Sequence, residues 1–149
     1  MDEAGVNDTL DYAYGYGPAS ERFYDLKSGH VTERVSMVAA WCDYEVLAPM
    51  TFKGYCNTLL FDAWVEQFLV PSLKPGQAVV IDNASFHKSA RTQELIEEAG
   101  CTVIFLPPYS PDLNKIEKFW ATLKHYLRKV LKNYKDLWSA VDDAFKALS

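Results

Sequence analysis

Cysteine is scarce in this sequence. The 149 residues hold three cysteines, Cys42, Cys56 and Cys101, and no two of them form a CxxC pair. A disulfide framework needs paired cysteines and a structural zinc site needs closely spaced ligands, so both kinds of stabilisation are disfavoured. Reduced thiols are typical of cytoplasmic proteins, and we therefore expect a cytoplasmic location.

Long apolar runs are also missing. No stretch approaches the roughly 20 apolar residues that a membrane-spanning helix needs, and no basic segment followed by an apolar one begins the chain. The sequence also shows no internal repeat, low-complexity tract or interdomain linker. With 49% hydrophobic and 23% charged residues, a chain of this length is typical of one soluble globular domain.

Positive charge is scarce over most of the chain. The net charge is −5, but residues 1–114 carry 7 Lys/Arg against 16 Asp/Glu, whereas residues 115–149 carry 8 against 4. The net charge of these two parts is therefore −9 and +4. A nucleic-acid partner is not excluded by the acidic total, because the basic residues gather in the last quarter of the sequence.

Strand and helix patterns alternate along the chain. Strands are predicted over Val31–Trp41 and Tyr44–Phe52, joined as a hairpin at Cys42–Asp43, and the preceding "YAYGYGP" (residues 12–18) has the composition of a strand and turn. Short apolar runs predict buried strands over Gln77–Asp82 and Cys101–Leu106.

The helical patterns lie between and after these strands. One helix is predicted over Asn57–Val70 and ends before Pro71, and another is capped by Ser89 and stopped by Gly100. Two more amphipathic helices follow Pro111. This order predicts an α/β sandwich around a mixed sheet.

Asp82 ends the apolar run "AVVID". Ligands of open α/β sheets gather at the carboxyl ends of strands, so an acid at this place is suited to chemistry. Strand-ending aspartates also begin turns, and Asp82 with Asn83 fits that interpretation as well. The residues alone leave both interpretations open.

The stretch "LPPYSPDLNKIEKFW" (Leu106–Trp120) leads from a proline-rich turn into an amphipathic helix. Asn114 and Glu117 have the spacing of a capping box, in which Glu117 would bond back to the start of the helix. Lys124 and Arg128 lie within about 20° of Glu117 around a helix. An acid followed along one face by two cations is also typical of a metal ligand with phosphate contacts beyond it.

Asp2 and Glu3 stand at the start of the chain, where position alone says little. If Asp2 converged with Asp82 and Glu117, the three carboxylates would repel, and cations would be needed to keep them all ionised. Oxygen ligands favour hard cations such as Mg²⁺ or Mn²⁺, which suit phosphoryl chemistry.

Three motifs of the sequence resemble those of one family, the DDE transposases of the mariner superfamily, in their bacterial insertion-sequence branch. "MDEAG" is similar to that family's first-acid motif, "VVIDNASFHK" to its second and "LPPYSPDLNKIEKFW" to its third. Between Asp82 and Glu117 lie 34 residues, the interval characteristic of that branch. The resemblance runs over essentially the whole chain.

This resemblance implies an α/β fold of the RNase H-like type, a mixed five-stranded sheet flanked by helices. In that fold Asp2 sits on the first strand, Asp82 at the end of the neighbouring fourth strand, and Glu117 on the helix after the fifth. The resemblance further implies that these three acids are the catalytic residues and that they bind two Mg²⁺ or Mn²⁺ ions.

The reaction implied by the resemblance is DNA transposition. Water attacks first at the ends of the element, and the freed 3′ hydroxyl then attacks target DNA, typically at a TA dinucleotide. The expected partner is double-stranded DNA, at the element ends and the target, bound by a homodimer. The expected location is the bacterial cytoplasm, at the nucleoid and away from any membrane.

Other motif residues have two interpretations each. Asn83 and His87 match the second motif and would order the site or meet DNA, although His87 could equally cap a helix or pack. Tyr109 and Asn114 would contact the DNA backbone or shape the proline turn. Lys124 and Arg128 would contact phosphates, and we expect Lys88 to be merely exposed.

Two features depart from the family pattern. Lys115 stands where the family usually has proline, and a cation there opposes the helix dipole, so some rigidity is lost. The chain also starts one residue before Asp2, without the upstream half of the first strand or the helix-turn-helix modules typical of the family. We interpret residues 1–149 as one catalytic domain, excised from a longer transposase or encoded in a truncated or split frame.

The abrupt start supports a second hypothesis. The chain could be an inactive fragment that folds or binds DNA weakly without catalysis. A third hypothesis, another RNase H-like nuclease such as a resolvase or ribonuclease, is disfavoured by the motif "SPDLN" followed by Glu117.

Overall fold

The computed structural model describes residues 1–10 and 33–149. The predicted strand and turn over residues 12–18 lie outside these described residues, as does the start of the strand predicted from Val31. None of the helices in the described parts is both long and apolar enough to cross a membrane.

Three antiparallel strands form the larger sheet, in the order β1 (Asp2–Asn7), β2 (Arg34–Cys42) and β3 (Glu45–Phe52). The predicted hairpin is confirmed, and its turn residues Asp43 and Tyr44 have φ values of 48° and 69°. Positive φ at both turn residues is the geometry that matches the right-handed twist of the two strands.

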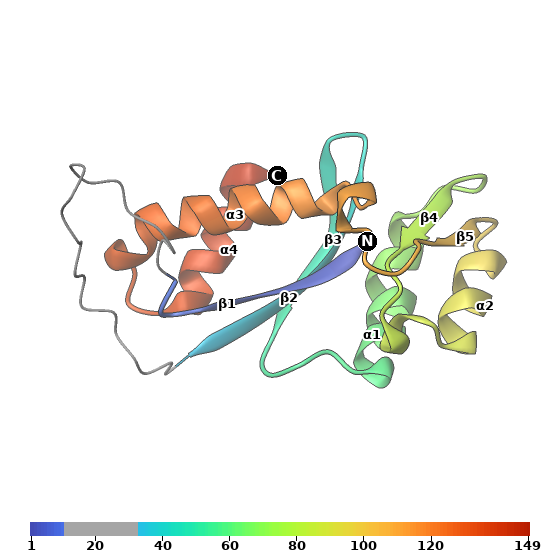
Figure 1. The fold of residues 1–149 in the computed structure, drawn as a ribbon, viewed down its shortest axis with the longest axis horizontal. Coiled ribbons are helices and arrows are strands. Elements are labelled where there is room, and N and C mark those ends of the chain that lie inside the picture. The colour runs from blue at the N-terminus through green and yellow to red at the C-terminus, as the bar shows by residue number, and fades with distance from the viewer. Residues whose placement is uncertain (11–32) are drawn as a thin grey trace.

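Two parallel strands, β4 (Ala78–Ile81) and β5 (Thr102–Phe105), form a second sheet beside the first. The amino group of Met1 donates a hydrogen bond to the Val80 carbonyl over 2.8 Å, which joins the start of β1 to β4. The letter N in Figure 1 marks this junction. The described residues thus contain five strands, the number implied by the family resemblance, with their hydrogen bonds divided between a group of three and a group of two.

Helices α3 (Ile116–Val130) and α4 (Leu137–Leu148) pack on one face of the larger sheet (Figure 1). The alternation of β1 and β2 turns every second side chain toward these helices. The buried side chains of this layer include Val6, Met37, Trp120, Leu123 and Leu127.

Helices α1 (Thr58–Trp64) and α2 (Ala90–Glu98) pack against β4, β5 and the opposite face of β2. The predicted caps are confirmed, because the Ser89 hydroxyl accepts from the Thr92 amide and Gly100 follows α2 with a φ of 79°. The helix predicted to end at Val70 continues to Ser72, so the predicted end before Pro71 comes two residues too early. The chain continues through a π-helical turn (Val65–Leu69) into a 3₁₀ turn (Val70–Ser72), which accommodates Pro71 in its first positions.

Candidate active site

Strand β1 positions Asp2. The side chains of Asp2, Ala4 and Val6 alternate with half-buried residues, so Asp2 shares the face of the sheet that α3 covers. Asp2 is 6% exposed, and its Oδ1 accepts a hydrogen bond from the Glu3 amide over 2.8 Å. The carboxyl group is therefore fixed in direction and largely removed from water.

Asp82 follows directly after the last residue of β4. Its Oδ1 accepts from the Ala84 amide over 3.2 Å and contacts Nδ1 of His87. The side chain thus begins a turn, which was the structural interpretation of the sequence. It also lies at the carboxyl end of a parallel strand, which was the basis of the chemical interpretation. The two interpretations are compatible, because the turn holds the carboxylate at the strand end.

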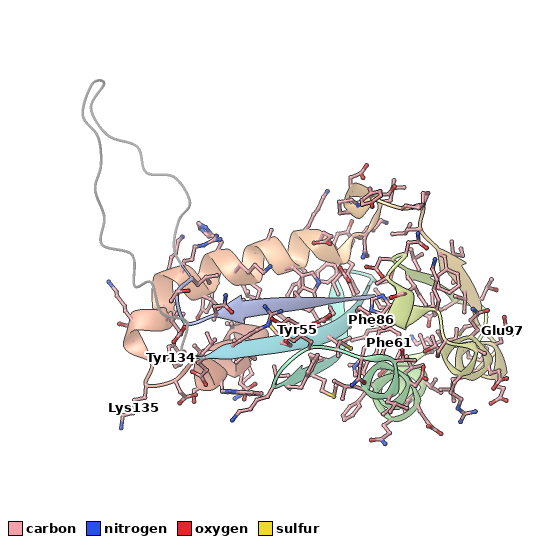
Figure 2. The ribbon with its side chains drawn as sticks, turned by 60° about the horizontal axis from the view of Figure 1, so that its bottom comes forward. Tyr55, Phe61, Phe86, Glu97, Tyr134 and Lys135 are labelled. Atoms are coloured by element: carbon pink, nitrogen blue, oxygen red, sulfur yellow. The ribbon has the colours of Figure 1, made fainter. Side chains whose placement is uncertain are left out.

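His87 is a buried partner of Asp82. It lies in a 3₁₀ turn (Ser85–His87), is 1% exposed, and packs between Phe61 and Phe86, each with its ring centroid 4.2 Å away. Figure 2 shows Phe61 and Phe86 side by side near the start of β1. Because an ionised Asp82 only accepts hydrogen bonds, the contact places a proton on Nδ1 of His87. The predicted roles of packing and ordering the site fit this position, whereas a direct DNA contact would require exposure.

The proline turn sets the start of α3. Tyr109 has a φ of 57°, a 3₁₀ turn follows over Pro111–Leu113, and the Glu117 amide donates to the carbonyl of Asn114 over 3.1 Å. The predicted capping box is wrong, because the residue that precedes α3 is Lys115, in helical geometry, and no side chain caps this end. The start of the helix is instead fixed by the backbone turn and by Asn114, which is buried.

The three acids of the motifs influence one another. The pKa of Asp2 is raised to about 7, mainly by burial and also by the negative charges of Asp82 and Glu117 and a side-chain hydrogen bond to Glu117, while the Glu3 amide acts in the opposite direction. The structure therefore brings together side chains from the start of β1, the end of β4 and the first turn of α3. Their convergence could not be read from sequence positions 2, 82 and 117 alone.

Asp82 shows the opposite shift. Burial raises its pKa, but the hydrogen bond and charge of His87, the Ala84 amide and the Met1 amino group together lower it below the ordinary value. Asp82 is therefore ionised at neutral pH, next to an Asp2 that is partly protonated. Such a separation between neighbouring acids is common at functional sites.

Two further charged groups lie beside the acids, of which the sequence analysis named Glu3 and missed the Met1 amino group. The Met1 amino group is buried, which lowers its pKa to about 6, and it interacts with both Asp2 and Asp82. Burial also raises the pKa of Glu3, which interacts with Arg34 and His87. The alternation of β1 separates Glu3 from Asp2, since neighbouring residues of a strand face opposite sides. Both residues belong to the motif "MDEAG", but the motif gave a role to Asp2 alone.

An open cleft of about 370 Å³ lies beside the acids. Asp82, Asn83 and Glu117 line it together with the proline turn, from Leu106 to Pro111, and Asn114. Tyr109 is fully exposed at this cleft. Lys88 is exposed, as predicted, and lies 5.9 Å from the centre of the Phe105 ring.

The chemistry of the acids fits a hard divalent cation. Within residues 1–10 and 33–149, no three His, Cys, Asp or Glu side chains are arranged as they stand to hold one ion together. The donors of Asp2, Asp82 and Glu117 are nevertheless all carboxylate oxygens, the ligands that Mg²⁺ and Mn²⁺ prefer. The pKa of Asp2 is raised mainly by burial and also by the negative charges of Asp82 and Glu117, and a bound cation would favour the ionised form of this carboxyl group.

Lys124 and Arg128 lie on the same helix as Glu117, and all three side chains are half-buried. Arg128 makes other interactions within the protein and its Nε atom is buried. Lys124 is therefore the better candidate of the two for a phosphate contact.

The fold is RNase H-like, of the transposase and integrase type. Its three acids meet where the two sheets and α3 join. The chain belongs to the DDE superfamily endonucleases, because the model of that family matches residues 1–138. The family and the fold class predicted from the sequence are confirmed.

Solved structures with a similar fold include two complexes of Mos1. The Mos1 transposase paired-end complex with left transposon end is 15% identical with a TM-score of 0.62, covering 99% of this chain and 52% of that one. The Mos1 mariner paired end complex with Mn is 14% identical with a TM-score of 0.61, covering 99% and 50%. The chain thus spans about half the length of the Mos1 chains it matches.

A third similar structure is the catalytic core domain of BIV integrase. It is 16% identical with a TM-score of 0.56, and the match covers 76% of this chain and 73% of that one. At these identities the likeness shows the fold alone. No curated protein matches the chain.

Proposed function

We propose that this chain is the catalytic domain of a transposase, a metal-dependent DNA endonuclease and strand transferase, with Asp2, Asp82 and Glu117 as its catalytic residues. The observation that supports this proposal most is the mutual influence of these three acids, which come from three separate motifs. The similar Mos1 structures, one a complex with a transposon end and the other a complex with Mn, agree with DNA and divalent ions as ligands.

In this proposal the three carboxylates hold two Mg²⁺ or Mn²⁺ ions. Such ions, when bound, would activate the attacking oxygen and stabilise the leaving oxygen. His87 holds Asp82 in one orientation, and the proline turn fixes the position of Glu117 in the first turn of α3. The reaction is hydrolysis at the ends of the element, followed by attack of the 3′ hydroxyl on target DNA, at TA, within a homodimer bound to DNA.

The test is nicking of supercoiled plasmid by the purified chain. We expect slow nicking that requires Mg²⁺ or Mn²⁺ and is lost in both Asp82→Asn and Glu117→Gln. The matched control is Asp112→Asn, since Asp112 is an exposed acid on the same proline turn and its amide variant should nick normally. DNA binding without metal-dependent nicking would support the alternative, a fragment that binds DNA without catalysis.

A further inference from the structure

Arg34 begins β2 on the face of the larger sheet that α3 and α4 do not cover. Val35 packs against those helices, so its neighbours Arg34 and Ser36 point to the opposite face. Ser36 lies opposite Gly5 of β1, and Figure 2 shows Tyr55 in front of these two strands. The residues of this face belong to β1, β2 and the connection between β3 and α1.

The guanidinium group of Arg34 packs against both Gly5 and Tyr55. Its Cζ atom is 4.6 Å from the centre of the Tyr55 ring, within the range in which a ring face attracts a cation. A Cβ atom at Gly5 would lie 2.5 Å from Nη2 and 2.9 Å from Cζ of Arg34. Any larger residue at position 5 would therefore displace the guanidinium group, and glycine makes room for it.

This guanidinium group has hydrogen-bonding capacity to spare. Within the described residues, the buried Nε atom of Arg34 has no hydrogen-bond partner and the side chain forms no ion pair. Glu3 interacts with Arg34 electrostatically, but the two groups are not within ion-pair distance. The terminal nitrogen atoms are not buried in the same way, so an anion can reach them. A planar fork of donors held in one place is suited to phosphate.

The surroundings of Arg34 favour the phosphate of a nucleic-acid strand. Lys53 is exposed in the same connection as Tyr55, and the Ser36 hydroxyl bonds to the carbonyl of Gly54 between them. Tyr55 is 76% exposed, so the ring face away from Arg34 is open to solvent. Two cations beside an open aromatic ring form the combination that binds single-stranded nucleic acid, through its phosphates and by stacking of a base.

We propose that this Arg34–Tyr55 site binds single-stranded DNA, with a phosphate on the guanidinium group and a base stacked on the open face of the Tyr55 ring. Lys53 adds a second phosphate contact. An interior base of a duplex has no free face for the ring, so the site selects single strands. The proposal rests on the proposed function only in taking DNA as the ligand, because no step of cleavage depends on it.

The experiment measures the fluorescence anisotropy of a short labelled oligothymidylate, titrated with the whole chain at low salt in EDTA. Tyr55→Ala should weaken binding about tenfold, as expected for the loss of one stacked base. Arg34→Ala should reduce the salt dependence by about 0.7 unit of slope, the value for one phosphate contact on a single strand. The matched controls are Tyr44→Ala, an exposed tyrosine of the β2–β3 turn, and Arg91→Ala on α2, and both should bind normally.

Gly5→Ala tests the seat of the guanidinium group without changing the charge. The added methyl group should weaken binding about threefold, the value of an exposed cation–π contact, and the melting temperature shows that the variant folds. An oligonucleotide of the same length without bases is the control ligand. Tyr55→Ala should leave its affinity unchanged, because no base is there to stack.

Several results would overturn the proposal. They are a failure of oligothymidylate to bind, equal affinities of Tyr55→Ala and Tyr44→Ala for it, an equal effect of Tyr55→Ala on both ligands, or normal binding by Gly5→Ala. Should Arg34→Ala fail to fold, Tyr55→Ala still decides, because Tyr55 is exposed. The measurement needs no metal, so a chain that fails to nick plasmid can still bind the oligothymidylate through this site.

Discussion

Asp2 and Asp82 are two carboxyl groups in one cluster whose surroundings shift their pKa values in opposite directions. Asp2 is buried beside two other acids, so its pKa rises to about 7. Asp82 is also penalised by burial, but contact with His87 and the Ala84 amide outweighs that penalty and lowers its pKa. At neutral pH the cluster therefore carries a firmly ionised Asp82 and a more readily protonated Asp2.

A divalent ion should stabilise the folded protein through this cluster. We expect millimolar Mg²⁺ or Mn²⁺ to raise the melting temperature by about 2–5 °C, because only the native state brings the acids together. Asp82→Asn should remove most of this gain, whereas Asp112→Asn should retain it. An unchanged melting curve of the folded, unaltered chain in the presence of metal would contradict joint binding.

Asp2 should make the metal-free protein less stable as the pH rises. Its folded pKa of about 7 exceeds the ordinary value of 3.8, so its contribution to stability is fully present below about pH 4 and is lost as the pH rises through 7. Asp2→Asn should therefore leave stability nearly unchanged at pH 4 and raise it by roughly 1–3 kcal/mol at pH 8. Urea unfolding in EDTA at both pH values measures this.

The Met1 amino group requires a control in the same measurement. Its pKa falls from 8.0 to about 6 on folding, so its contribution is present above pH 8 and is lost as the pH falls through 6. The amino group is present in both proteins, so comparing Asp2→Asn with the unaltered chain at each pH largely cancels its effect. An equal gain at pH 4 and pH 8 would mean that ionisation of Asp2 does not cause it.

Tyr109 has a backbone conformation that glycine would adopt more easily. Its φ of 57° is strained for a tyrosine, and its side chain is fully exposed, so packing does not explain the residue. Tyr109→Gly should raise stability by up to about 1 kcal/mol and weaken DNA binding, in keeping with a DNA contact at the cleft. Urea unfolding and a DNA titration separate the two effects. Unchanged DNA affinity would mean that Tyr109 only shapes the turn.

Among the helices and strands, features set by short sequence patterns could be predicted, whereas features that depend on tertiary contacts could not. The hairpin and the Ser89 cap follow from short patterns, and both are present. The capping box at Glu117 follows from an equally good pattern and is absent, because the proline turn gives Lys115 helical geometry before the first helical residue. The pairing of His87 with Asp82 depends on packing against Phe61, from a helix some 20 residues earlier, so no local spacing reveals it.

Helix α3 should bind DNA through phosphates rather than bases. Lys124 shares a helix face with Glu117, so we expect Lys124→Ala to weaken binding similarly on unrelated DNA sequences and to reduce the salt dependence by about one unit of slope. Arg128→Ala should behave similarly, although its other interactions within the protein make it a less clean probe. Lys146→Ala is the control, because it removes the same charge from α4, where Lys146 pairs with Asp143. A loss confined to one DNA sequence would indicate base recognition instead.

At the scale of the whole molecule, the acids lie where two hydrophobic layers meet. The layer of α3 and α4 packs on one face of β1 and β2, and the layer of α1 and α2 packs around β4 and the opposite face. Asp2 lies on the face of β1 that the layer of α3 and α4 covers, whereas Asp82 follows β4, which packs with the layer of α1 and α2. The described link between β1 and β4 is the Met1 hydrogen bond, so the relative position of the two acids depends on a short stretch of pairing.

The position of Asp2 should therefore limit the rate of DNA cleavage. An error of about 1 Å in a catalytic group can cost a hundredfold in rate, and terminal strand residues fray more easily than interior ones. Adding four β-forming residues before Met1 would place paired strand on both sides of Asp2, between residues 40–42 of β2 and 78–80 of β4. We expect the extended chain to nick supercoiled plasmid at least tenfold faster in Mg²⁺, without gaining recognition of element ends. Each protein is compared with its own Glu117→Gln variant, and equal Glu117-dependent rates in the two would show that the existing pairing already holds Asp2 in place.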